Sequence, residues 1–153
     1  MIISEKLNMF RENFNNIIKH SLGLYLKSFS FNKSLEQQII NFACLTNFVA
    51  LKGGLLKREQ MISGDMADIF SNLYLALAVE YYDKHNPVSP ILTKYIVDKL
   101  LNENQMKMNK VIDNLGKERH LLKHLHKSVN TDSYEEERRL FNEILNNEKI
   151  MNE

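Results

Sequence analysis

The 153-residue sequence has few of the residues that interrupt helices or cross-link chains. It contains two prolines, five glycines, one cysteine and no tryptophan. So few prolines and glycines argue against a β-sandwich, a barrel or a disordered linker, because all of these need frequent turns or flexible segments. The single cysteine, Cys44, excludes an intrachain disulfide and makes a cysteine-based zinc site a poor interpretation.

Long apolar runs and an excess of charge of one sign are also missing. No run reaches the roughly 18 apolar residues that a membrane-spanning helix needs. The N-terminal segment MIISEKLNMFREN lacks the apolar centre of a signal peptide, so it is expected to be part of the folded domain. The 20 basic and 19 acidic side chains give a formal net charge of +1, and nothing in that balance favours nucleic acid as a partner.

Apolar residues recur every three or four positions along nearly the whole chain, which is the spacing of amphipathic helices. This pattern predicts an all-α protein, a single helical domain over residues 1–153 that forms an antiparallel bundle of five to six helices. The expected helices lie near residues 4–27, 34–51, 55–84, 90–114 and 133–150, with a short helix over 117–127. Ser4 is an expected N-cap, and Ser133 with Glu136 has the spacing of a capping box.

Two apolar stripes are the main candidates for buried helix faces. The first helix carries Leu7, Phe10, Phe14, Ile17, Ile18 and Leu22, and the third carries Ile62, Met66, Ile69, Phe70, Leu73 and Leu77. The run over residues 73–79 is the most apolar in the chain, so it is expected at the centre of the bundle. Phe29 and Phe31 follow the first helix outside its stripe and are expected to stay exposed as part of a docking surface.

Familiar catalytic and cofactor motifs are absent, including G-x-G-x-x-G, the P-loop, H-E-x-x-H and paired Glu-x-x-His motifs. His120, His124 and His126 are the best metal candidates, because His120 and His124 lie one helical turn apart. Two imidazoles make a weak site, however, and the neighbouring Lys123 and Lys127 repel a cation. A solvated basic face is the preferred interpretation.

Three further features have a chemical and a structural interpretation. The glycine pair at 53–54, followed by the basic pair at 57–58, could hold a phosphate at a helix N-terminus, but a bend between two helices is expected instead. Asp65 and Asp68 share a helix face and could act in acid–base chemistry, but a cap or a polar contact is expected. Cys44 is expected to be a small buried hydrophobic residue. No catalytic, cofactor-binding or metal-binding residue is predicted.

The segment over residues 50–87 resembles part of the C-terminal helical extension of bacterial long-chain acyl-CoA dehydrogenases. Matching residues occur in register without a gap: Gly-Gly at 53–54, Leu-Lys-Arg at 56–58, Ile-Ser at 62–63, Ala-Asp-Ile at 67–69 and Leu-Tyr-Leu-Ala at 73–76. Weaker similarity covers residues 1–115, and residues 116–153 form a divergent helical tail. No residue of this chain matches a catalytic position of the family.

The resemblance implies a freestanding, non-catalytic accessory domain linked to fatty-acid β-oxidation. Such a domain would dock on a catalytic chain, which would carry the FAD, or would be a remnant of one. One alternative is a helical homo-oligomeric interaction protein, and another is an enzyme or acyl-CoA binder that uses a cleft in the bundle. The expected location is cytoplasmic. Related very-long-chain enzymes use this region to contact the membrane, so the resemblance also allows peripheral contact with the inner membrane.

Overall fold

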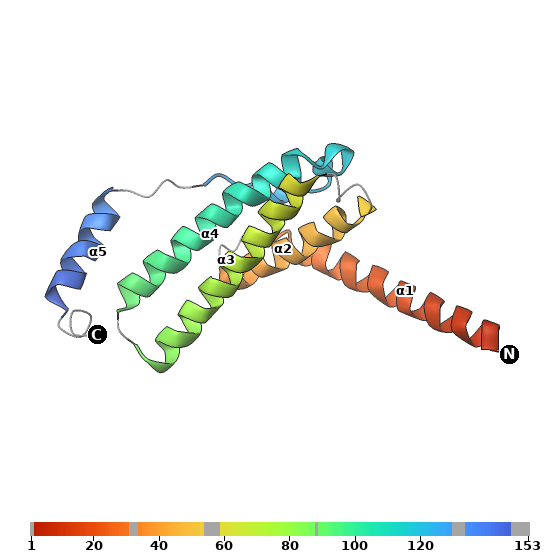
Figure 1. Ribbon diagram of the computed structural model, residues 1–153, viewed down its shortest axis with the longest axis horizontal. Coiled ribbons are helices and arrows are strands. Elements are labelled where there is room, and N and C mark those ends of the chain that lie inside the picture. Colours follow the sequence, from red (N-terminus) through yellow and green to blue (C-terminus); the bar gives the residue numbers. More distant parts are fainter. Residues whose placement is uncertain (1, 31–33, 54–58, 88, 130–133, 148–153) are drawn as a thin grey trace.

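The computed structural model describes residues 2–30, 34–53, 59–87, 89–129 and 134–147 (Figure 1). Within these ranges the chain is all-α, which confirms the predicted fold class. The helices are α1 (Ile2–Lys27), α2 (Leu35–Ala50), α3 (Gln60–His85), α4 (Pro90–Asp113) and α5 (Tyr134–Asn146), with the short 3-10 helices η2 (Gly116–His120) and η3 (Lys123–Leu125) between α4 and α5. The short helix expected over 117–127 is therefore two 3-10 turns. None of the described helices is long and apolar enough to cross a membrane.

Serine side chains fix where two of the helices begin. The Ser34 hydroxyl oxygen accepts from the backbone N–H of Gln37 at 3.2 Å, and the Ser89 hydroxyl oxygen accepts from that of Leu92 at 3.2 Å. The prediction that Ser4 caps the first helix is wrong, because α1 begins at Ile2 and Ser4 lies inside its first turn. The predicted capping box at Ser133 falls outside the described residues.

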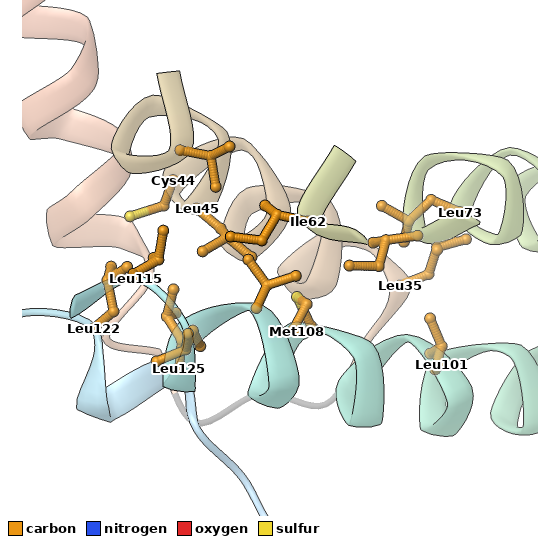
Figure 2. Close-up of a cluster of buried hydrophobic side chains, with 14 of the residues drawn as sticks. Leu35, Cys44, Leu45, Ile62, Leu73, Leu101, Met108, Leu115, Leu122 and Leu125 are labelled. Carbon is orange, nitrogen blue, oxygen red and sulfur yellow. The ribbon is translucent and has the colours of Figure 1, made fainter. Parts of the chain in front are cut away.

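The core lies where α2, α3 and α4 meet. α3 and α4 run antiparallel and side by side, α2 packs against both, and η2 and η3 cover one end of α4 (Figure 1). Figure 2 shows side chains from α2, α3, α4, η3 and the residues beside η2 and η3 in one cluster. Leu35 lies beside Leu73, and Leu122 and Leu125 lie near Leu115. Cys44 is 1% exposed within this cluster, so its expected role as a buried hydrophobic residue is confirmed.

The orientation of α3 corrects two of the predicted core positions. Ile62, Ile69 and Leu73 are buried as expected, but Phe70 is 63% exposed and Leu77 is 50% exposed. The buried residues of α3, which also include Ala76, follow a narrow seam of seven-, four- and three-residue steps that faces α2 and α4. Phe70 and Leu77 each come one position after a seam residue, which turns them by about 100° around the helix axis.

The run over residues 73–79 is therefore not the centre of the bundle. Only Leu73 and Ala76 in this run are buried, whereas Tyr74, Leu75 and Leu77 are exposed. The apolar stripe in the sequence includes two adjacent faces of α3, and only one of these faces packs against a neighbouring helix.

Amide side chains join α2 to α4 inside the core. The Gln38 side-chain amide donates to the Leu101 carbonyl at 2.8 Å, and the Asn104 side-chain amide donates to the Gln38 side-chain carbonyl at 3.1 Å. Both residues are buried, and Asn104 is completely inaccessible. These bonds pair both polar ends of the Gln38 side chain and the Asn104 side-chain nitrogen, which would otherwise be costly to bury, and they fix the relative position of the two helices.

Candidate docking surfaces

The N-terminal part of α1 projects away from the rest of the molecule (Figure 1). Every residue from 4 to 20 is exposed, so no described element covers any side of this part of the helix. We call residues 4–20 the α1 arm. The stripe predicted for the first helix is present, but it does not contribute to the core of this chain.

The α1 arm carries a continuous apolar face. Leu7, Phe10, Phe14 and Ile17 are spaced by three, four and three residues, and each is more than half exposed. The rings of Phe10 and Phe14 stack with their centroids 6.2 Å apart. The face continues toward the body through exposed Leu22. An apolar surface of this kind is typical of a site that another molecule covers.

Aromatic contacts and hydrogen bonds attach the C-terminal end of α1 to η3. The ring of Phe29 stacks on that of His124 with centroids 3.8 Å apart, and the Ser28 hydroxyl oxygen lies 2.6 Å from His124 Nε2. The Tyr25 hydroxyl donates to the Leu121 carbonyl at 3.0 Å. Burial lowers the pKa of His124. A hydrogen bond with the Leu121 backbone raises this pKa in part, and the positive charge of Lys127 lowers it further. His124 is thus a neutral side chain that supports the base of the arm.

The pair of Ser28 and His124 has the composition of a nucleophile and its base, but its surroundings do not suit catalysis. Ser28 is 1% exposed, and its hydroxyl also donates to the Tyr25 carbonyl at 2.6 Å. Burial raises the pKa of the neighbouring Cys44 thiol and outweighs the opposing effect of its hydrogen bond with Ser28. A nucleophile must reach its substrate, so we interpret this cluster as structural.

The histidine candidates do not come together as a metal site. His124 points into the contact with Phe29, which corrects the expectation that it lies on a solvated basic face. His126 is exposed, and its Nε2 lies 3.5 Å from the Asp113 carboxylate. No group of three or more metal-binding side chains occurs within the described ranges. The contact between His124 and Phe29 could not be predicted from α-helical spacing, because η2 and η3 are short 3-10 helices in place of one α-helix.

A second exposed apolar surface lies on α3. Phe70, Tyr74, Leu77 and Tyr81 are spaced by four, three and four residues, and each is at least half exposed. The ring of Phe42 on α2, which is partly buried against the core, lies 6.3 Å from that of Phe70. We call these four residues of α3 the α3 stripe. Of the two phenylalanines expected in a docking surface, Phe29 is 47% exposed but lies against His124, and Phe31 lies outside the described residues.

Both candidate acidic residues of α3 form ion pairs with α4. The Asp65 carboxylate lies 2.8 Å from Lys110 Nζ, and the Asp68 carboxylate lies 2.9 Å from Lys107 Nζ. The predicted polar contacts are therefore confirmed. Gly53 adopts a φ of +53°, which suits a bend, but the rest of the expected phosphate-binding segment lies outside the described residues.

A cavity of about 480 Å³ adjoins the first of these ion pairs, between the start of α3 and the end of α4. Its lining includes Glu59, Asp65 and Lys110. FAD requires donors for its pyrophosphate and its isoalloxazine ring. Each carboxylate of this lining lies close to a lysine, Asp65 to Lys110 at 2.8 Å and Glu59 to Lys52 at 3.5 Å. These lysines already face carboxylates, so the described lining offers a pyrophosphate no further cation. We therefore derive no chemical step through a flavin in this cavity.

The chain matches the model of the family described as acyl-CoA dehydrogenase, C-terminal, bacterial type. The match covers residues 8–145, and thus continues past residue 115 through most of the tail that we expected to diverge. Neither the curated proteins nor the solved structures include a match to the chain. The matched residues span α1 from within its first turns to nearly the end of α5. The chain therefore belongs to the family of bacterial-type acyl-CoA dehydrogenase C-terminal domains.

Proposed function

We propose that this chain is a non-catalytic accessory domain that docks on a flavin-containing acyl-CoA dehydrogenase chain and acts in fatty-acid β-oxidation in the cytoplasm. The observation that carries the proposal is the family match over residues 8–145. The chemistry of the described cavity supports it, because the lysines beside the cavity pair with its own carboxylates and leave no further cation for the pyrophosphate of FAD or of an acyl-CoA. Such a domain acts by binding its partner, and we expect one of its exposed apolar surfaces to form the contact.

The α3 stripe is the surface that we assign to the catalytic chain. It lies on the body of the domain, where α4 and α2 hold α3 in place, so binding requires little ordering of the backbone. Tyrosine and phenylalanine are enriched at the centres of protein interfaces because each brings a large apolar area and few rotatable bonds. Tyr74 and Leu77 form the middle of the stripe and are expected to contribute most to binding.

The test is association in trans with an acyl-CoA dehydrogenase shortened to remove its own C-terminal helical domain. The full chain is titrated into that enzyme, and the dissociation constant is measured by calorimetry. Tyr74→Asp or Leu77→Asp should weaken binding by about 30-fold or more, the effect of losing an interface hot spot. Ser71→Asp is the matched control, because Ser71 is exposed on the same helix outside the stripe and gains the same charge.

The two parts of the proposal fail in different ways. Lack of association between the full chain and the shortened enzyme would contradict the accessory function itself. Association that Tyr74→Asp and Ser71→Asp weaken equally would leave the accessory function standing and would exclude the α3 stripe as its surface.

A further inference from the structure

We propose that the α1 arm binds the α1 arm of a second copy of this chain, as an antiparallel helix pair. The arm is exposed on all sides from residue 4 to residue 20 and carries one apolar face. This proposal concerns a different surface and a different partner from the proposed function, and it does not depend on it.

The area of the apolar face is sufficient for a stable dimer. Leu7, Phe10, Phe14, Ile17 and Ile18 are between 49% and 70% exposed. These fractions correspond to roughly 500–700 Å² of side-chain surface per copy, so a symmetric pair can bury up to roughly 1,000–1,400 Å², which reaches the size of a standard stable interface. The face is at the upper end of the roughly 300–600 Å² of the largest apolar patch on a typical monomer.

The spacing of the apolar face determines the register of the pair. The steps of three, four and three residues between Leu7, Phe10, Phe14 and Ile17 are those of a coiled-coil seam. An antiparallel pair centred at residue 12 places Leu7 opposite the partner's Ile17, and Phe10 opposite the partner's Phe14. Both copies then use the same residues around a two-fold axis, as a closed dimer requires.

The shape of the molecule favours the antiparallel arrangement. The arm extends from one end of the body (Figure 1). Antiparallel arms place the two bodies at opposite ends of the helix pair, where they do not compete for space. Parallel arms would place both bodies at the same end, side by side.

The residues that border the apolar face fit a protein partner better than a lipid surface. Between residues 7 and 18 only Arg11 and Glu12 are charged, and four positions are asparagine. Helices that lie on anionic membranes carry many lysines and arginines on their polar side, whereas the centres of protein interfaces are depleted in charge. Arg11 of each copy lies at the solvent-exposed rim near the axis, where salt screens the repulsion between the two copies.

The first test measures the mass of the purified chain in solution over a range of concentrations by sedimentation equilibrium. The expected mass is twice the 18.0 kDa of one chain. Phe14→Asp should raise the dimer dissociation constant by at least about 30-fold, because both copies lose a central aromatic side chain. The control Asn16→Asp introduces the same charge on the opposite face of the arm and should leave the dimer intact. Circular dichroism should show equal helicity in both variants, since residues 14 and 16 are exposed in the monomer.

The second test measures the register with two variants, each of which adds one cysteine at one end of the arm. Lys6→Cys and His20→Cys should form a disulfide only when the two variants are mixed, because residues 6 and 20 flank the same layer of an antiparallel pair. In a parallel pair the two positions are separated by about 21 Å along the axis. Buried Cys44 does not compete. A monomer at all concentrations, a dimer insensitive to Phe14→Asp, or a disulfide in either variant alone would overturn the proposal.

Discussion

Replacing Leu73 by alanine distinguishes the buried seam of α3 from its exposed stripe. Leu73 is 5% exposed and packs near Leu35 within the core between α2 and α4 (Figure 2). The change removes three carbon groups, worth about 2.4 kcal/mol at about 0.8 kcal/mol each. The cavity left behind adds to that loss, because the surrounding helices relax only partly. We expect Leu73→Ala to lower the free energy of unfolding by about 3 kcal/mol.

Leu77→Ala is the matched control, because it makes the same chemical change one turn further along the same helix. Leu77 is 50% exposed, so alanine leaves no closed cavity and loses about half of the transfer free energy. The expected cost is about 1 kcal/mol. The difference in helix propensity between leucine and alanine is common to both variants and cancels in the comparison.

Urea unfolding followed by circular dichroism measures both values, with all chains at one concentration because self-association makes stability depend on concentration. The reasoning predicts a difference of about 2 kcal/mol between the two variants, with similar slopes against urea. Equal destabilisation by Leu77→Ala and Leu73→Ala would refute the orientation of α3, and with it the α3 stripe as an exposed surface.

Three further measurements test the helix ends and the buried polar groups. Gly116→Ala should lower the free energy of unfolding by about 1 kcal/mol, because Gly116 has a φ of +79°. Gly64→Ala, at an exposed position inside α3, should raise it by about 0.5 kcal/mol, and thermal melting compares the two variants. The contribution of His124 to the free energy of unfolding should be fully present above the ordinary histidine pKa near 6.5, and should be lost as the pH falls toward the lowered pKa of folded His124. The urea midpoint of the parent chain should therefore fall over this pH range, and that of His124→Phe should fall less. Asn104→Ala should cost about 1–3 kcal/mol in urea, because it leaves the buried side-chain oxygen of Gln38 without its donor.

The helices could be predicted from the sequence because their signals are local. Helical spacing, the loop between Pro87 and Pro90, and the serine before α2 together located the five helices. The periodic stripe on α1 was also identified. Its burial could not be predicted, because an apolar face has the same spacing whether it packs within the chain or against another molecule.

Features that depend on contacts between distant residues were missed. Nothing near Gln38 in the sequence indicates that its partner is Asn104, and nothing near Ser28 indicates His124. The exposed position of Phe70 depends on how far α3 is rotated against α4, which a stripe of apolar residues two faces wide does not determine. For the candidate sites, charge and spacing identified the acidic pair on α3, but not the lysines of α4 that neutralise it.

The account depends most on the claim that this domain works by binding and carries out no chemistry of its own. The direct measurement records the visible spectrum of the purified chain after incubation with FAD, and then assays it with a long-chain acyl-CoA and an electron acceptor. We expect a spectrum without protein-bound flavin and no acyl-CoA-dependent reduction of the acceptor. Flavin bound at near one equivalent, or reduction that depends on acyl-CoA, would contradict the account.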